Sequence, residues 1–293
     1  YRSQDSTGDC EVTVYPVFSG IELVYYDVHM QSCDINLAKG REMLIITHCQ
    51  EGRIEFEYKN GEYLYLASGD LSIQKNTENI RHRYCPLSHY HGVSVAIDMN
   101  RVPRCFSCIL DDVFVSPEEL EMKFCSEKPY SIMRENISIE HIFSELYSVP
   151  ENIRKGYHKV KVLELLLFLS GLEYKGESEE RRYFSRSQVT AAKEAKKYLL
   201  AHLDEHITIT ELADMLGISS TSLKICFKGV YGDTINGYIT NCKMQKAASL
   251  LKNTDKSVLE IAGIVGYNNG SKFAGAFRRV MNKSPNEYRK SLV

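Results

Sequence analysis

Histidine spacing marks the first group of residues that could do chemistry. His89 and His91 flank Tyr90 and would place two imidazoles on the same face of a strand, with His82 nearby, which is a spacing that suits metal ligands. A metal-dependent active site would also need a carboxylate a few residues on, and none follows His91 before Asp98. We therefore expect no metal here and interpret these histidines as ordinary surface or core side chains.

Cysteine spacing marks a second group. Cys105 and Cys108 form a C-x-x-C pair, which could hold zinc or cycle between thiol and disulfide. Zinc needs four ligands, and the chain has no second C-x-x-C. The nine cysteines are otherwise scattered and odd in number, a pattern typical of reduced thiols in the cytoplasm. We expect buried structural cysteines and no cofactor.

Composition and charge indicate a globular protein with two unlike domains. The 293 residues exceed one ordinary core, with 43% hydrophobic and 25% charged residues. The most apolar stretch, 160–172, is interrupted by Lys161 and Glu164, which argues against a membrane span. Residues 1–186 carry 21 Lys and Arg against 29 Asp and Glu, whereas residues 187–293 carry 15 against 9. The basic C-terminal part predicts a polyanionic partner.

Residues 1–130 have the pattern of a small antiparallel β-domain. Phe56 and Tyr58 alternate with charged residues and precede Asn60-Gly61, a strong signal for a two-residue hairpin turn. Such a turn would pair Tyr58 with Tyr63 and Phe56 with Tyr65. Further strand-like runs span 11–18, 22–29, 43–49, 71–74 and 93–98. Together they predict a barrel or a sandwich.

Residues 131–174 have helical periodicity. The segment from His158 to Tyr174 has two apolar stripes, one through Leu163 and one through Leu166. A helix on a domain surface needs only one, so we expect the surplus stripe, marked by Leu163 or Leu166, to meet a second copy in a homodimer. A helix wholly buried in its own monomer would show the same excess and stays an alternative.

The last third of the chain contains one pattern twice. Thr208-x-x-Glu211 and Ser257-x-x-Glu260 are both capping boxes, in which a hydroxyl and a glutamate satisfy the first N-H groups of a helix. In each copy a glycine, Gly217 or Gly266, stands where a helix would end in a left-handed residue, and a second capped helix follows. The two copies predict helix-turn-helix motifs at about 208–229 and 257–279.

The remaining segments complete an α+β protein. A long helix should join the two copies around 235–251, another should precede them around 189–203, and a short one should begin at Ser284-Pro285. Residues 175–187 lack periodicity and are expected to link the helical segment at 131–174 to an all-α domain at 188–293.

The C-terminal motifs resemble those of the AraC/XylS family of bacterial transcription regulators. They are L-A-x-x-L-G-I-S at 212–219, L-x-x-x-F-K at 223–228, I-A-x-x-V-G-Y at 261–267, F-x-x-x-F-R-R at 273–279 and S-P-x-x-Y-R at 284–289. Residues 1–130 are similar, more loosely, to the cupin-like β-barrel sensing domains of that family, and residues 131–174 to its dimerisation helices.

The resemblance implies two recognition helices that enter successive major-groove segments of promoter DNA. Ile225 stands where the family often has an arginine, and Gly270, Ala274 and Gly275 offer almost no side chain. We therefore expect Thr221 and Lys224 to read bases, and the second copy to act mainly through backbone and phosphate contacts. The expected DNA contacts are Ser220, Thr221, Ser222, Lys224, Ile225, Lys228, Asn269, Ser271, Lys272 and Arg278.

The expected function is a cytoplasmic, non-enzymatic, DNA-binding regulator of transcription that responds to a small-molecule effector. Aromatic side chains that could stack on the effector inside the barrel, or simply fill its core, are Tyr25, Phe56, Tyr58, Tyr63 and Tyr65. RNA polymerase would be a further partner of an activator. Two alternatives stay open: a cupin-type metal-dependent enzyme or sensor with an attached DNA-binding domain, and an interaction protein whose tail binds DNA without regulation.

Overall fold

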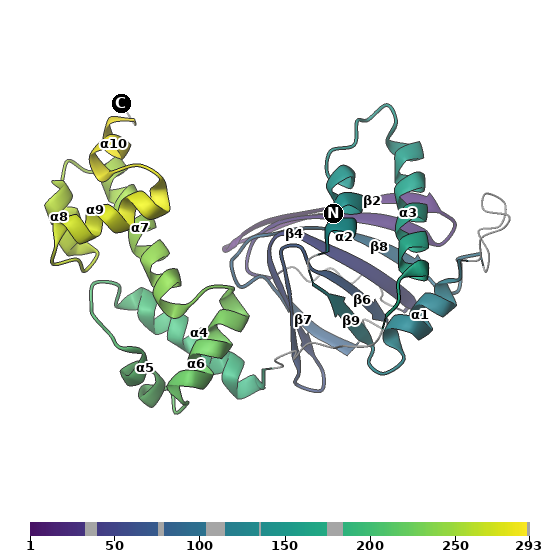
Figure 1. Ribbon diagram of the computed structural model, residues 1–293, viewed down its shortest axis with the longest axis horizontal. Coiled ribbons are helices and arrows are strands. Elements are labelled where there is room, and N and C mark those ends of the chain that lie inside the picture. The colour runs from purple at the N-terminus through teal and green to yellow at the C-terminus, as the bar shows by residue number, and fades with distance from the viewer. Residues whose placement is uncertain (33–39, 76–78, 104–114, 135, 175–183, 292–293) are drawn as a thin grey trace. The chain divides into compact units, whose positions relative to one another are not determined.

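The chain divides into two compact units, Tyr1–Tyr183 and Phe184–Val293. The computed structural model in Figure 1 describes residues 1–32, 40–75, 79–103, 115–134, 136–174 and 184–291. Cys105, Cys108 and residues 175–183 of the expected linker lie outside these ranges. The last residues of that expected linker are already helical, because Ser185 caps a helix that begins at Arg186.

The N-terminal unit is built on antiparallel strands. They are β1 (Arg2–Asp5), β2 (Gly8–Phe18), β3 (Ile21–His29), β4 (Met43–Tyr58), β5 (Tyr63–Ala67), β6 (Leu71–Lys75), β7 (Ile80–Tyr84), β8 (Tyr90–Asp98) and β9 (Tyr130–Met133). The main sheet has the order β1-β2-β3-β8-β4-β6-β9, and the last part of β4 pairs instead with β5 and β7. All the strand-like runs of the sequence are therefore strands.

The described strands do not close into a barrel. Their order begins at β1 and ends at β9, so the main sheet has two edges. β4 pairs with β8 and β6 along its first part and with β5 and β7 along its last, so this one strand belongs to two sheets. One apolar cluster lies between the two sheets and a second lies between the main sheet and helices, so both faces are buried without closure.

The hairpin between β4 and β5 has a different register from the one predicted. Glu57 pairs with Tyr63, and the N-H of Tyr58 donates to the carbonyl of Glu62 at 2.9 Å. The loop is therefore three residues long, with Gly61 left-handed at φ 84, which is the turn plus bulge that three-residue hairpins use. The predicted pairs were wrong because one extra loop residue moves every partner by one position.

Three helices pack on one face of the main sheet (Figure 1): α1 (Pro117–Cys125), α2 (Ile137–Leu146) and α3 (Arg154–Gly171). In α3 the stripe through Val162, Leu166 and Leu169 is fully buried, so Leu166 belongs to the core of its own unit and the prediction of it as a dimer contact was wrong. The other stripe is only partly covered. Leu163 is half-buried, and Val160 on the same stripe is 61% exposed.

The C-terminal unit is all-helical, as the sequence predicted. Its helices are α4 (Arg186–Ala201), α5 (Ile209–Met215), α6 (Ser220–Tyr231), α7 (Ile235–Asn253), α8 (Val258–Ile264), α9 (Gly270–Met281) and α10 (Pro285–Lys290). The pairs α5–α6 and α8–α9 are the two helix-turn-helix motifs, and α7 is the long helix between them. Among the described helices, none combines the length and the apolar character that crossing a membrane requires.

Candidate nucleic-acid interface

Both helix-turn-helix motifs have the caps that their sequences predict. Thr208 and Ser257 each form a complete capping box with the glutamate three residues on, and the hydrogen bonds from these residues lower the pKa of Glu211 and Glu260. The turns contain Gly217 at φ 65 and Gly266 at φ 76. Each pair of helices therefore meets through a left-handed glycine, which lets the second helix leave at a defined angle.

In the first motif, α4 holds the second helix, α6. The side-chain amide of Gln188 donates to the Oγ atom of Ser222 at 3.1 Å, and the thiol of Cys226 donates to the carbonyl of Gln188 at 3.0 Å. Phe184 packs so closely on Gly229 that a Cβ atom there would lie 2.1 Å from its ring. These contacts fix α6 by its inner face and leave the opposite face outward.

In the second motif, α7 holds α9 through an apolar core. Phe273 and Phe277 of α9 are fully buried against residues of α7 and α8, such as Met244 and Ile261. The ammonium group of Lys243 lies over the ring of Tyr267 at 5.7 Å from its centroid, and burial lowers its pKa. The second motif thus has its own scaffold and its own inner face.

The outward face of α6 contains most of the first predicted set. Thr221, Lys224 and Lys228 are exposed, and Ser220 and Ile225 are half-buried. Ser222 is the exception, because its hydroxyl accepts the hydrogen bond from Gln188. The N-H groups of Ser220 and Thr221 stand at the first two helical positions, ahead of the intrahelical hydrogen bonds, so they remain available to an acceptor such as a phosphate oxygen.

The outward face of α9 has cations but few other side chains. Ser271, Lys272 and Arg278 are exposed, whereas the side chain of Asn269 caps the helix by accepting from the N-H of Lys272 at 2.9 Å. Gly275 is exposed too, with nothing within 4 Å of where its Cβ would be. The predicted contacts of the second copy thus share a face, but Asn269 acts in the structure as a cap.

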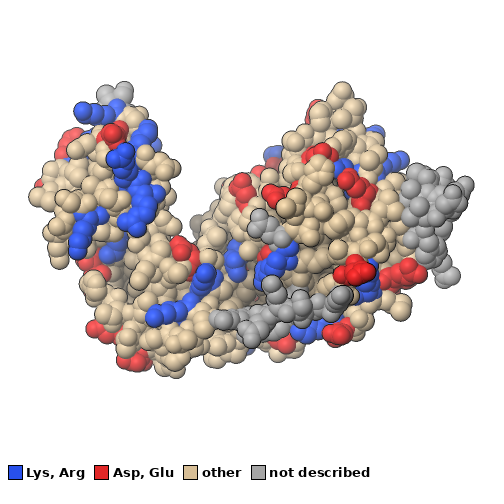
Figure 2. All heavy atoms as spheres, viewed as in Figure 1, with Lys and Arg blue, Asp and Glu red and all other residues tan. Residues whose placement is uncertain are grey.

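The positive charge of the C-terminal unit gathers around its last helices. Figure 2 shows Lys and Arg side chains close together over the part of this unit formed by α9 and α10. The exposed cations of this part are Lys272, Arg278, Arg279, Lys283 and Lys290. Within the described chain, no carboxylate lies within ion-pair distance of Lys224, Lys228, Lys272 or Arg278. Arg279 and Lys283 were absent from the predicted set, although the Arg-Arg pair that ends α9 signals the first of them.

The five predicted effector residues do not form one set. Phe56 and Tyr58 lie in the cluster between the two sheets, while Tyr63 and Tyr65 alternate onto the other face of β5, where Tyr65 donates to Glu55 at 2.6 Å. Tyr25 lies under the helices, donates to the carbonyl of Leu146 at 3.0 Å and contacts the imidazole of His158. The one-residue error in hairpin register explains the separation of Tyr63 and Tyr65, because it exchanged the two faces of β5.

The histidine pair has partners that sequence spacing did not reveal. His89 and His91 lie beside His29 of β3, and each of the three offers a nitrogen within 4.8 Å of the others. His82 belongs to β7, and its backbone pairs with Glu57. Asp27 and His29 alternate along β3 as His89 and His91 do in the segment at β8, and β3 pairs with β8. This second alternation in the sequence could have indicated the cluster.

Comparison with known proteins supports the assignment of helix-turn-helix motifs to the C-terminal unit. A family model described as a helix-turn-helix domain matches residues 212–291. The xylose operon regulatory protein of Escherichia coli is 31% identical over 153 residues, which cover 49% of this chain and 39% of that protein. The melibiose operon regulatory protein of the same species is 30% identical over 93 residues, which cover 32% of this chain and 31% of that protein.

The chain spans well under half the length of both these curated relatives. Among solved structures, the C-terminal domain of AraT, a response regulator from Geobacillus stearothermophilus, is 32% identical with a TM-score of 0.34 and covers 34% of this chain and 84% of that chain. The residues that the domain model matches include the motifs that form α6 to α10. Residues 212–291 therefore form a helix-turn-helix domain of the AraC type, similar to those of these regulators.

Proposed function

We propose that the protein is a sequence-specific DNA-binding regulator of transcription and not an enzyme. The observation that carries this is the pair of second helices, α6 and α9, each fixed by its inner face and each presenting exposed cations and a helix start outward. Duplex DNA is the polyanion that this arrangement suits, because two such helices can follow one face of the duplex. A regulator of this kind works beside the chromosome, so we place it in the cytoplasm.

The two motifs have different roles in this proposal. Thr221 and Lys224 are exposed on α6 and are side chains that hydrogen-bond to base edges, whereas α9 presents Ser271, Lys272 and Arg278 around bare glycines. The first motif then selects the sequence, and the second anchors the protein through phosphates and brings its backbone close to the DNA. Ile225 contributes only contact with a thymine methyl group.

The test separates a regulator from a protein that merely binds DNA. Footprinting of the full chain on the genomic region around its own gene gives the bound site. Deletion of the gene is then expected to change transcription from the footprinted promoter, and a chain with Lys224→Ala is expected not to restore it. Strong footprints with unchanged transcription would support the interaction protein instead. If the change is activation, RNA polymerase is the expected further partner.

We further propose that the N-terminal unit keeps the cupin-like sensing role and binds a small-molecule effector. Two relatives are named as regulators of sugar operons, so sugars are the first class to try. Phe56 and Tyr58, in the interior between the two sheets, are the aromatic side chains best placed to stack on a sugar ring there. Xylose and melibiose, tested separately, are the probes; the expected result is a higher Tm and a changed affinity for the footprinted DNA with one of them.

We also propose a homodimer through the partly covered stripe of α3, with a second copy as its occupant. Val160 and Leu163 leave apolar surface exposed on a helix whose opposite stripe already fills the core. Leu163→Asp is expected to yield a folded monomer with about 10²-fold or greater loss on a two-site operator, since avidity is lost. Leu166→Asp, which buries a charge, is the control and should unfold the unit. A wild-type monomer at micromolar concentration in sedimentation would contradict the dimer.

A further inference from the structure

Three neighbouring strands of the N-terminal unit bring histidines and carboxylates to one place. β3 pairs with β8 so that Asp27 faces His91, and β8 pairs with β4 so that Glu51 faces His91 from the other side. Asp27 and His29 are two residues apart on β3, His91 lies in β8, and His89 directly precedes that strand; the four side chains lie close together. Tyr25 has the same alternation on β3 and lies under α2 and α3, which identifies the face of Asp27 and His29 as the one that carries the helices.

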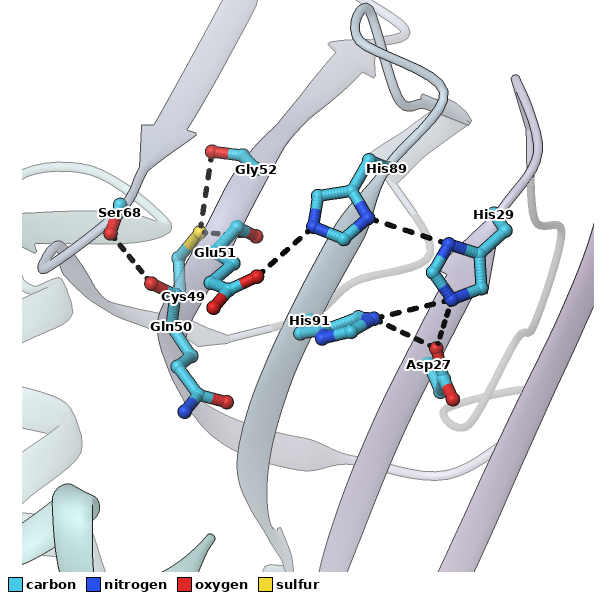
Figure 3. A network of polar contacts seen from close by, with 9 residues as sticks. All are labelled: Asp27, His29, Cys49, Gln50, Glu51, Gly52, Ser68, His89 and His91. Atoms are coloured by element: carbon cyan, nitrogen blue, oxygen red, sulfur yellow. Dashed lines mark hydrogen bonds and ion pairs between the residues drawn. The ribbon is translucent and has the colours of Figure 1, made fainter. Parts of the chain in front are cut away.

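The donor atoms of this cluster converge (Figure 3). The Nε2 atoms of His29 and His91 are 3.4 Å apart, and the Oδ1 atom of Asp27 lies 2.9 and 2.8 Å from them. A tetrahedral ion with bonds of about 2.0 to 2.1 Å has its ligand atoms about 3.3 Å apart. These three atoms therefore form a triangle close to the size of one face of such a site.

The third imidazole lies beside this triangle. The Nδ1 atom of His89 is 3.4 Å from the Nδ1 atom of His29, and the ring centroids of His89 and His91 are 4.6 Å apart. The Nε2 atom of His89 contacts Glu51 at 3.2 Å. A carboxylate on the far nitrogen of an imidazole is the usual outer partner of a metal-bound histidine, because it sets the ring orientation and strengthens the donor.

The backbone around His89 is held firmly. A Cβ atom at Gly52 would lie 2.1 Å from the carbonyl oxygen of His89, so only glycine allows this approach, and φ at Gly52 is 79. The N-H of Arg53 donates to the same carbonyl at 3.3 Å. The irregularity in β4 between Cys49 and Glu51 thus places Glu51 and His89 together and fixes their separation.

We propose that His29, His89, His91 and Asp27 together bind one divalent first-row transition-metal ion. Neutral imidazoles suit zinc, nickel, copper and iron, whereas magnesium and calcium prefer sites built of oxygen alone. Asp27 and Glu51 supply the negative charge that a divalent ion requires. The side chains of His29, His89 and His91 are 47%, 36% and 30% exposed, so an ion can enter from solvent and a water can complete its coordination.

The primary experiment measures zinc binding by the full chain without a histidine tag and without DNA. The chain is stripped with a chelator, dialysed and titrated with zinc chloride against a chromogenic competitor. We expect one ion per chain, and an affinity lowered by more than about tenfold in His29→Gln, His91→Gln or Asp27→Asn, since loss of even an outer partner costs that much. His82→Gln, an exposed histidine of the same unit on β7, is the matched control and should bind as the wild type does.

The absorption spectrum of bound cobalt(II) distinguishes nitrogen and oxygen ligands from thiolates. The stripped chain with one equivalent of cobalt(II) should show the visible bands of a tetrahedral nitrogen and oxygen site, and should lack the near-ultraviolet band of a cobalt–thiolate bond. A thiolate band, or zinc affinity unchanged in both His29→Gln and His91→Gln, would overturn the proposal and point to cysteines. Each variant is checked by circular dichroism, and Asp27→Asn serves if a histidine variant fails to fold. Because no DNA is present, the outcome is independent of the proposed regulatory function.

Discussion

The two helix-turn-helix motifs share their construction and differ in what they present. Both begin with a capping box, both turn through a left-handed glycine and both are held by a long helix on the inner side. The first then offers Thr221 and Lys224 on its outward face, while the second offers Gly275 and cations. The repeated residues thus build the motif, and the residues that differ between the copies set what each contributes to DNA recognition.

The largest expected effect comes from the two turn glycines, which are equivalent in sequence but not in surroundings. Gly266→Ala should lower the free energy of unfolding by clearly more than the about 1 to 2 kcal/mol that a left-handed alanine costs, because the added Cβ atom would lie 2.6 Å from the carbonyl oxygen of Asp204. Gly217→Ala should lower it only by the cost of the left-handed backbone, since nothing lies within 4 Å of the added Cβ atom. Urea unfolding of residues 184–293 measures both, and equal losses would refute the distinction.

The next effect separates base reading from phosphate contact. Thr221→Ala or Lys224→Ala should lose about 1 to 3 kcal/mol at particular base pairs and leave other sequences nearly unaffected. Lys272→Ala or Arg278→Ala should weaken binding to all sequences alike and reduce the salt slope by about 1. Binding to a set of single-base operator variants at several salt concentrations distinguishes the two patterns. An equal loss of affinity for all DNA sequences in all four variants would contradict the assignment of base reading to the first motif and phosphate contact to the second.

The smallest effect concerns the bare face of α9. Gly275 and Gly263 are both exposed helical glycines with open space around the Cβ position, so alanine at either should raise the unfolding free energy by about 0.5 to 1 kcal/mol. Gly275→Ala alone should weaken DNA binding, because its methyl group would hold the backbone away from a phosphate. Gly263→Ala, on α8, is the control. Equal DNA affinity of the two variants would place Gly275 outside the interface.

Local signals in the sequence predicted the C-terminal unit well. The caps at Thr208 and Ser257 and the left-handed glycines are decided by neighbouring residues, so they can be read from spacing alone. Features that depend only on residues within one turn of a helix can be predicted from the sequence alone.

Long-range pairing decided what sequence reasoning missed. The hairpin at Asn60-Gly61 was recognised, but its loop length was wrong by one residue, and this separated Tyr63 and Tyr65 from Phe56. His29 lies 60 residues before His89, and only the pairing of β3 with β8 brings them together. The two stripes of α3 were seen, but which stripe is buried depends on the sheet beneath it.

The most direct test of the central claim is selection of DNA from a random duplex library by the full chain, followed by a salt titration on the selected site. We expect an enriched sequence in which one segment is sharply defined, where α6 reads, and the adjoining segment about one helical turn away is poorly defined, where α9 anchors. The logarithm of the affinity should fall linearly with the logarithm of the salt concentration. A library that stays random after selection, or binding that does not respond to salt, would contradict the account.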